Sequence, residues 1–271
     1  MKIDNMQEKT KYALITGATG GLGQAFCNVL AKRGYVLLLT GRSKEKLDAL
    51  HSELCEQYKD LNVHIYAADL SILDDRTALM QAIKKDGFRL SLLVNVAGAD
   101  VQKALTEYTQ EKIAFQCRVN FEAAASLCRF AIENRAECLQ ILNISSVSGI
   151  YPMPYFAIYS ATKGALTSFS LSLREEMKGR GVNVTAVLPG AMPTRDDIKK
   201  QIQGQGLWGK MAAKTPYSVA ESSLKAVAKN KGKCIVGFWN KVMRLSTWWI
   251  PASWRLKFIA KRWSKISKDA F

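Results

Sequence analysis

Histidine is scarce in this chain of 271 residues, where only His51 and His64 occur. Neither lies beside a nucleophile motif, which argues against a Ser-His-Asp site. The six cysteines stand singly and form no CxxC pair, a pattern typical of reduced thiols in a cytosolic protein and not of a zinc site. We therefore expect no metal centre.

Long apolar runs are also absent. No stretch of about eighteen uncharged apolar residues occurs, so no membrane-spanning helix is expected. The first residues, MKIDNMQEKT, are polar and lack the apolar segment of a signal peptide. We expect a cytoplasmic protein.

Acidic residues are outnumbered by basic ones, with 23 Asp and Glu against 39 Lys and Arg, for a net charge of +16. The excess is uneven along the chain. From residue 241 onward, eight basic residues stand against one acid, Asp269. The C-terminal end is therefore a candidate for contact with an anionic surface.

Seven short apolar runs alternate with helical patterns. The predicted strands are 12–16, 35–40, 63–68, 90–95, 139–145, 182–188 and 233–237. Such alternation predicts an α/β fold: a doubly wound, seven-stranded parallel sheet with helices on both faces. We expect one domain over residues 1–238 and a basic, Trp-rich extension over residues 239–271.

A glycine-rich turn, TGATGGLG at residues 16–23, follows the first strand and opens a helix. Gly17, Gly21 and Gly23 let the backbone turn tightly and approach a pyrophosphate, and the helix N-terminus offers free N–H groups. The alternative is an ordinary tight turn, which also favours glycine. In this context, the spacing favours a dinucleotide site.

The turn after the second strand, LLTGRSKEKL, holds Arg42 where NAD-binding folds often carry an acid. An arginine suits the 2′-phosphate of NADP(H). The alternatives, a surface arginine and NAD(H) as cofactor, stay open.

Ser146, Tyr159 and Lys163 lie in the stretch ISSVSGIYPMPYFAIYSATKGAL. Ser146 ends the fifth strand, and Tyr159 and Lys163 lie one turn apart on the next helix. A lysine cation favours the phenolate and lowers the tyrosine pKa, which would suit Tyr159 to acid/base work on a carbonyl or an alcohol. Ser146 would hydrogen-bond the substrate oxygen. An isolated YxxxK is more often a half-buried tyrosine and a solvated lysine.

TGATGGLG, NVAG (95–98), Asn120, Ser146, YSATK (159–163) and PGAMPT (189–194) occur in the order seen in short-chain dehydrogenases/reductases, and residues 10–237 resemble that single-domain Rossmann-fold family. The resemblance implies that Tyr159 is the acid/base, that Lys163 binds the nicotinamide ribose, that Ser146 orients the carbonyl and that Asn120 holds a proton-relay water. It implies a homodimer or homotetramer. The cofactor residues that the motifs and the resemblance together suggest are Gly17, Thr19, Gly20, Gly21, Leu22, Gly23, Arg42, Asp69, Leu70, Asn95, Ala97, Gly98, Tyr159, Lys163, Pro189, Gly190 and Thr194.

Two positions depart from the family pattern. Val96 replaces the second asparagine of the common NNAG form. Thr19 and Gly20 stand where many NADP-using members carry a basic residue, which weakens the assignment of NADP.

Two segments, 149–157 and 195–218, are expected to wall the substrate cleft. Their inward candidates are apolar or aromatic: Tyr151, Met153, Tyr155, Leu207, Trp208 and Met211. They favour an apolar carbonyl or alcohol, steroid-like or fatty-acyl, over a small sugar. The alternative is that they pack a lid on the core.

In the extension, Pro251 separates two helical segments. In the second, Leu256, Ile259, Trp263 and Ile266 form one apolar stripe among basic residues. This composition is typical of a helix lying in an anionic membrane interface. The alternative is packing of the stripe on the domain or on another subunit. Nucleic-acid binding is disfavoured because no recognition motif is present.

The sequence therefore favours an NADP(H)-dependent oxidoreductase that interconverts a carbonyl and a secondary alcohol, peripheral to the inner face of a membrane if the tail binds one. A catalytically silent dinucleotide-binding redox sensor and a membrane-surface scaffold are the alternatives.

Overall fold

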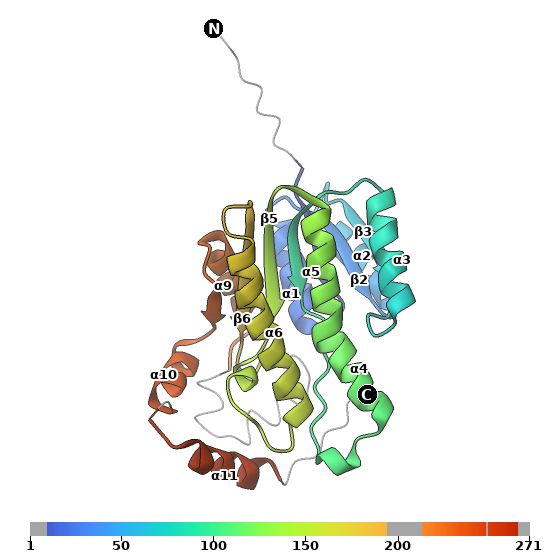
Figure 1. Cartoon of the computed structure of the whole chain (residues 1–271). Helices are drawn as coiled ribbons and strands as arrows, with labels where there is room; N and C mark the ends of the chain where they lie inside the picture. Colours follow the sequence, from blue (N-terminus) through green and yellow to red (C-terminus); the bar gives the residue numbers. More distant parts are fainter. Residues whose placement is uncertain (1–9, 194–212, 248, 265–271) are drawn as a thin grey trace.

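The apolar runs form a seven-stranded parallel sheet in the computed structural model, which describes residues 10–193, 213–247 and 249–264 (Figure 1). The strands are β1 (Tyr12–Thr16), β2 (Val36–Gly41), β3 (Val63–Ala67), β4 (Leu90–Asn95), β5 (Arg135–Ile144), β6 (Val182–Leu188) and β7 (Lys233–Ile235). The predicted sheet is confirmed, and the bounds of β1, β4 and β6 are as expected. The strands are apolar along their length because helices cover both faces of the sheet.

Nine α-helices lie among the described residues. They are α1 (Gly21–Ala31), α2 (Lys44–Gln57), α3 (Leu73–Lys85), α4 (Gln110–Cys117), α5 (Ala123–Glu133), α6 (Ala157–Glu176), α9 (Pro216–Ala228), α10 (Phe238–Thr247) and α11 (Ala252–Trp263). Three further short segments are η1 (Leu105–Glu107), the π-helical η2 (Arg118–Glu122) and η3 (Val147–Gly149). No helix in the described ranges is long and apolar enough to cross a bilayer.

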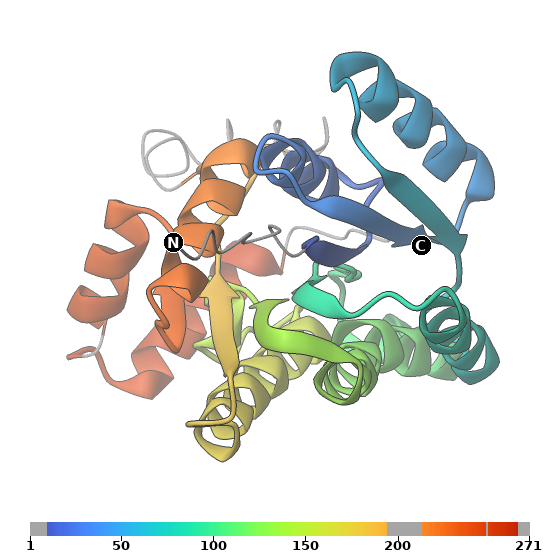
Figure 2. The ribbon, with the colours of Figure 1, turned by 90° about the horizontal axis from the view of Figure 1, so that it is seen from above.

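Helices cover both faces of the sheet (Figure 2), and a hydrophobic layer packs against each face. One contains Phe26 of α1, Leu47 of α2 and Leu224 of α9. The other contains Leu79 of α3 and Leu127 of α5, together with residues of α6. These helices are amphipathic, and burial of their apolar faces stabilises the fold.

Strand β5 begins four residues earlier than predicted. Its first residues, Arg135 to Cys138, are not an apolar run, which is why the sequence pattern missed them. The pairing of β4 with β5 shifts register between Leu90 and Leu92, where β5 carries the extra residues. The bulge leaves the carboxyl end of β5 in register with β4, so Asn95 pairs with Asn143.

The strand order β3-β2-β1-β4-β5-β6-β7 reverses direction between β1 and β4. Ligands of such sheets bind outside the carboxyl ends of the strands at this reversal. Here the hydroxyl of Thr16 accepts hydrogen bonds from the backbone N–H groups of Val96 and Ala97, both 3.0 Å long. The two strand ends that flank the reversal are thereby tied together.

Candidate active site

The glycine turn brings the N-terminus of α1 close to β1. Gly17 has a φ of 59°, and a Cβ atom there would lie 3.0 Å from the backbone of Ala97. A Cβ atom at Gly23 would lie 2.2 Å from the carbonyl oxygen of Gly17, so no side chain fits. Helix α1 has neither a capping side chain nor an acidic residue in its first turn. Its free N–H groups are suited to an anion such as a pyrophosphate.

The predicted cofactor positions 19 to 22 surround this helix start. Gly20 is the N-cap and Gly21 the first helical residue, while Leu22 is buried in the core. The side chain of Thr19 packs near Gly41, at the end of β2. The structure thus brings the ends of β1 and β2 together.

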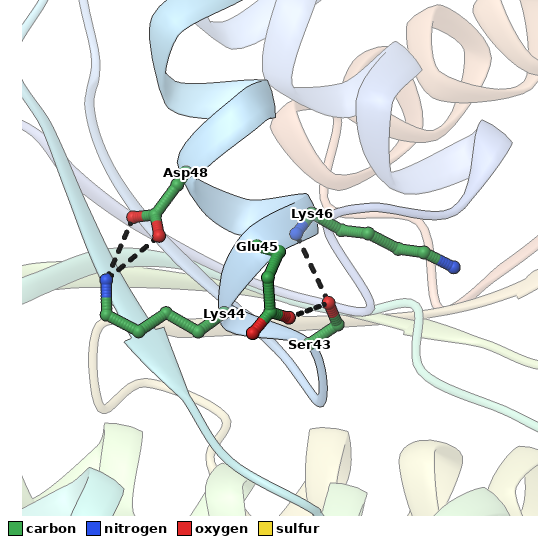
Figure 3. A network of polar contacts seen from close by, with 5 residues as sticks. All are labelled: Ser43, Lys44, Glu45, Lys46 and Asp48. Atoms are coloured by element: carbon green, nitrogen blue, oxygen red, sulfur yellow. Dashed lines mark hydrogen bonds and ion pairs between the residues drawn. The ribbon is translucent and has the colours of Figure 1, made fainter.

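A polar network opens α2 directly after β2 (Figure 3). The Ser43 hydroxyl accepts from the backbone N–H of Lys46 and donates to the Glu45 carboxylate, at 3.2 and 2.7 Å. Lys44 pairs with Asp48 at 2.9 Å. Arg42 is exposed, with its guanidinium 5.6 Å from the ring centroid of Phe115. The carboxylate of Glu45, held at this turn by Ser43, was not foreseen from the sequence.

The ends of β3 and β4 hold the next predicted residues. The Asp69 carboxylate accepts hydrogen bonds from the backbone N–H and the hydroxyl of Ser71, at 2.8 and 2.7 Å. Leu70 is buried, and its carbonyl accepts from Arg76. Ala97 lies against Gly17.

Asn95 lies differently from the prediction of a cofactor wall. It is buried, and its amide donates to the Asn143 side chain at 2.8 Å. This side chain joins the ends of β4 and β5 inside the protein.

Ser146, Tyr159 and Lys163 come together where β5 ends and α6 begins. The Ser146 side chain lies close enough to Tyr159 to lower the pKa of its phenol. The Ser146 hydroxyl also accepts from the hydroxyl of Ser148 at 2.6 Å. The Lys163 ammonium lies 5.7 Å from the Tyr159 ring centroid and donates to the carbonyl of Ile144 at 2.8 Å. The short connection and the one-turn spacing on α6 explain why the three side chains converge.

The pKa of Tyr159 is shifted in the direction opposite to the prediction. Burial raises this pKa, the carboxylate of Asp100 raises it further, and only the Ser146 side chain lowers it. Burial also lowers the pKa of Lys163 to about 8, with Asp100 opposing that shift. Removing a phenolate from water thus outweighs the help that the neighbouring ammonium can give. Tyr159 in this site retains its proton.

Asn120 lies in the π-helical turn η2, between α4 and α5. Its side-chain oxygen accepts from the backbone N–H of Ala99, and its amide donates to the carbonyl of Ala99 and to Thr162, with distances of 2.7, 3.0 and 3.1 Å. The side chain therefore fixes the loop after β4 against α6. The proton-relay water stays a prediction.

Gly98 lies where this loop meets α6. A Cβ atom there would come within 3.1 Å of the Lys163 ammonium and 3.2 Å of the Asn120 oxygen. The loop also carries Asp100, which acts on both catalytic pKa values. Asp100 was missed in the sequence, although it is the second residue after NVAG.

The predicted substrate residues separate in the structure. Tyr155 has a φ of 62° and lines a cavity of about 270 Å³ with Leu105, Tyr108, Ile158 and Ala260 of α11. Tyr151 instead contacts the extension: its hydroxyl lies 2.6 Å from that of Thr247, and the guanidinium of Arg255 stacks on its ring.

Other predicted residues lie at or beyond the edge of this site. The half-buried Met153 accepts a backbone hydrogen bond from Phe156. Pro189 is buried, and Gly190 packs against Asn240 of α10. Thr194, Leu207, Trp208 and Met211 lie outside the described residues.

Aromatic rings connect Tyr159, the candidate acid/base, to the extension. Phe156 stacks on Tyr159 with ring centroids 4.3 Å apart, and Trp263 of α11 stacks on Phe156 at 6.3 Å. Phe156 was not singled out from the sequence, although it precedes Tyr159 by three residues. Trp263 of α11 is therefore linked to the candidate acid/base, Tyr159, through the ring of Phe156.

Comparison with known proteins agrees with this geometry. The short chain dehydrogenase family matches residues 11–203. The chain belongs to the short-chain dehydrogenase family. The predicted resemblance and fold are thereby confirmed.

Curated relatives include very-long-chain 3-oxoacyl-CoA reductases. The protein from Bos taurus is 34% identical over 193 residues, which cover 68% of this chain and 60% of that protein. The protein from Macaca fascicularis is 32% identical over 226 residues, which cover 80% of this chain and 68% of that protein. The chain thus spans about three fifths of the length of several of these relatives.

Solved structures of the family superpose well. A bulky-bulky ketone specific alcohol dehydrogenase from Comamonas testosteroni is 26% identical, with a TM-score of 0.72 over 88% of this chain and 92% of that one. A 7β-hydroxysteroid dehydrogenase gives a TM-score of 0.81 at 24% identity, over 92% and 96% of the two chains, and this likeness concerns the fold alone.

Proposed function

We propose that this dehydrogenase reduces the ketone of an apolar substrate to a secondary alcohol, with NADPH as the hydride donor. The observation that carries the proposal is the convergence of Ser146, Tyr159 and Lys163 where β5 ends and α6 begins, with the Lys163 ammonium 5.7 Å from the Tyr159 ring centroid. A phenol that keeps its proton is suited to give it to a carbonyl oxygen. The names of the curated relatives, which are reductases, support reduction as the direction.

A nicotinamide cofactor held at the glycine turn of Gly17, Gly21 and Gly23 would supply the hydride for the carbonyl carbon. The chain supplies the proton: the O–H bond of Tyr159 breaks as a new O–H bond forms on the substrate oxygen. The Ser146 hydroxyl donates a hydrogen bond to the same oxygen and stabilises its developing negative charge. The Lys163 ammonium, 5.7 Å from the phenol ring, stabilises the phenolate that remains.

NADP(H) is the proposed cofactor because Arg42, an exposed cation, directly follows the end of β2, where an arginine suits a 2′-phosphate. One observation favours NAD(H) instead. The carboxylate of Glu45, held by Ser43 at the same turn, could accept a hydrogen bond from a ribose 2′-hydroxyl. Under this alternative, Glu45→Gln would weaken NADH binding. Under our proposal, it would leave NADPH binding unchanged.

A fatty-acyl ketone is the proposed substrate. The cavity beside α6 is lined largely by apolar groups, including Leu105, Pro154, Ile158 and Ala260, with Lys103 among the lining residues. A lysine near an apolar cavity suits a chain with an anionic head. The names of the relatives support a 3-oxoacyl thioester, and the ketone reductase from Comamonas testosteroni supports bulky ketones as the second candidate.

The test is consumption of NADPH, followed by its absorbance, with 3-oxoacyl-CoA thioesters of increasing chain length and with bulky ketones. Tyr159→Phe keeps the ring stack on Phe156 but removes the proton, so turnover should fall by at least about a hundredfold. Cofactor binding should persist. Turnover within tenfold of the parent would remove Tyr159 from the mechanism.

The catalytically silent alternative predicts NADPH binding without turnover on any ketone. Retention of Ser146, Tyr159 and Lys163 together argues against it. A homodimer or homotetramer is proposed from family membership, and light scattering on the purified chain tests it.

A further inference from the structure

The outward face of α11 carries aromatic and basic side chains. Trp254, Lys257, Phe258 and Lys261 fall at i, i+3, i+4 and i+7, so they share one side of the helix. Trp254 and Phe258 are 70% and 68% exposed, and both lysines are exposed. We call these four residues, with the preceding Trp249 and Ile250, the docking face. Trp249 is 80% exposed and Ile250 is 41% exposed.

The opposite side of α11 packs on the protein. Leu256, Ile259 and Trp263 are half-buried, and Trp263 reaches Phe156. The apolar stripe predicted from the sequence is therefore this inward side, and its packing on the domain agrees with the alternative to membrane contact. Its last member, Ile266, lies outside the described residues.

The positive charge of the extension favours an anionic partner for the docking face. Residues 238–264 contain six Lys and Arg and no acid. A second copy of the chain would bring Lys257 and Lys261 of one subunit against the same lysines of the other, with no acid of the extension to offset them. An anionic lipid surface offsets all of them, and its interface accepts the tryptophan and phenylalanine rings.

We infer that the docking face binds the surface of an anionic lipid bilayer. The rings enter the boundary between headgroups and acyl chains, and the lysines extend toward lipid phosphates. This contact is independent of the proposed reaction, because it depends only on residues outside the catalytic set.

The position of α11 would bring a bound bilayer close to the cavity. In Figure 1, α11 forms the lower end of the molecule, beside the start of α6. Its Ala260 lines the cavity, and its Trp263 stacks toward Tyr159 through Phe156. A bound bilayer would therefore lie on the other side of the helix that walls the cavity. If the proposed substrate class holds, an acyl ketone would pass from the bilayer to the cavity along α11.

Sedimentation with lipid vesicles tests the docking face in the full chain. The parent should pellet with vesicles of equal parts phosphatidylglycerol and phosphatidylcholine at low salt, and not with phosphatidylcholine alone. Lys257→Glu with Lys261→Glu should weaken binding at least about thirtyfold. Trp254→Ala with Phe258→Ala should weaken it about tenfold or more. All four positions are exposed, so the melting temperature should hold.

Matched controls come from exposed residues at the two ends of α3. Lys84→Glu with Lys85→Glu makes the same change in net charge, and Ile72→Ala with Leu73→Ala removes exposed apolar groups. Both controls should bind vesicles like the parent. No binding by the parent, or equal loss in the controls, would overturn the inference.

Light scattering tests the remaining alternative, in which a second copy of the chain covers the docking face. If Trp254→Ala with Phe258→Ala instead breaks an oligomer while the parent ignores vesicles, a second copy covers this face and the bilayer is excluded. The readout requires no turnover, so a failure of the proposed reaction would leave it unaffected.

Discussion

Replacing Gly23 by alanine tests the close approach of α1 to the strand turn. The new Cβ atom would lie 2.2 Å from the Gly17 carbonyl oxygen and 2.7 Å from the Ala18 backbone. Ordinary van der Waals contact for a Cβ atom begins near 3.4 Å, so the backbone must separate by about 1 Å. Overpacking of this kind costs about 1–3 kcal/mol, which for a chain of this size lowers the melting temperature by roughly 3–10 °C.

Gly20→Ala is the matched control. It makes the same chemical change in the same turn, but its Cβ atom would approach no closer than 3.4 Å to its nearest neighbour. Thermal unfolding without cofactor should therefore separate the two variants. If Gly23→Ala has the same melting temperature as Gly20→Ala and the parent, the turn is loose and the reasoning about its glycines fails.

Two further predictions concern charge. Asp100→Asn removes a carboxylate that raises the pKa of Tyr159, so the tyrosine should lose its proton at lower pH. The alkaline decline in kcat/KM for ketone reduction should therefore move to lower pH. An unmoved decline would show that Asp100 does not act on the proton donor. Arg42→Ala should weaken NADPH binding roughly tenfold to a hundredfold and NADH binding little, while Lys44→Ala, whose ammonium is paired with Asp48, should affect neither; equal loss of both cofactors in Arg42→Ala would contradict the assignment.

The sheet could be predicted because its strands are buried on both faces and therefore read as apolar runs. Strand β2, VLLLTG, is the clearest case. Strand β5 shows the limit of that signal. Its first residues pair across a bulge and are partly exposed, so no apolar pattern marks them.

The convergence of the three candidate catalytic side chains could be predicted because it depends on local spacing. Tyr159 and Lys163 lie one helical turn apart in any α-helix, and Ser146 ends a recognisable strand. The direction of the tyrosine pKa could not be predicted, because it depends on burial and on Asp100, which comes from another loop. Contacts between distant segments, such as Trp263 with Phe156, leave no periodic mark in the sequence.

The anchoring of α10 determines where this chain can be shortened. Asn240 is buried, donates to the carbonyl of Val236 at 2.7 Å and packs against Gly190, so α10 is fixed against the turn after β6. Thr247, seven residues on, holds the hydroxyl of Tyr151. Truncation at residue 238 would therefore uncover the turn after β6 along with removing the docking face. A protein that ends after Thr247 would keep both anchors of α10 but lose Ala260 and Trp263 of α11, so a chain that keeps the whole cavity wall must extend through Trp263.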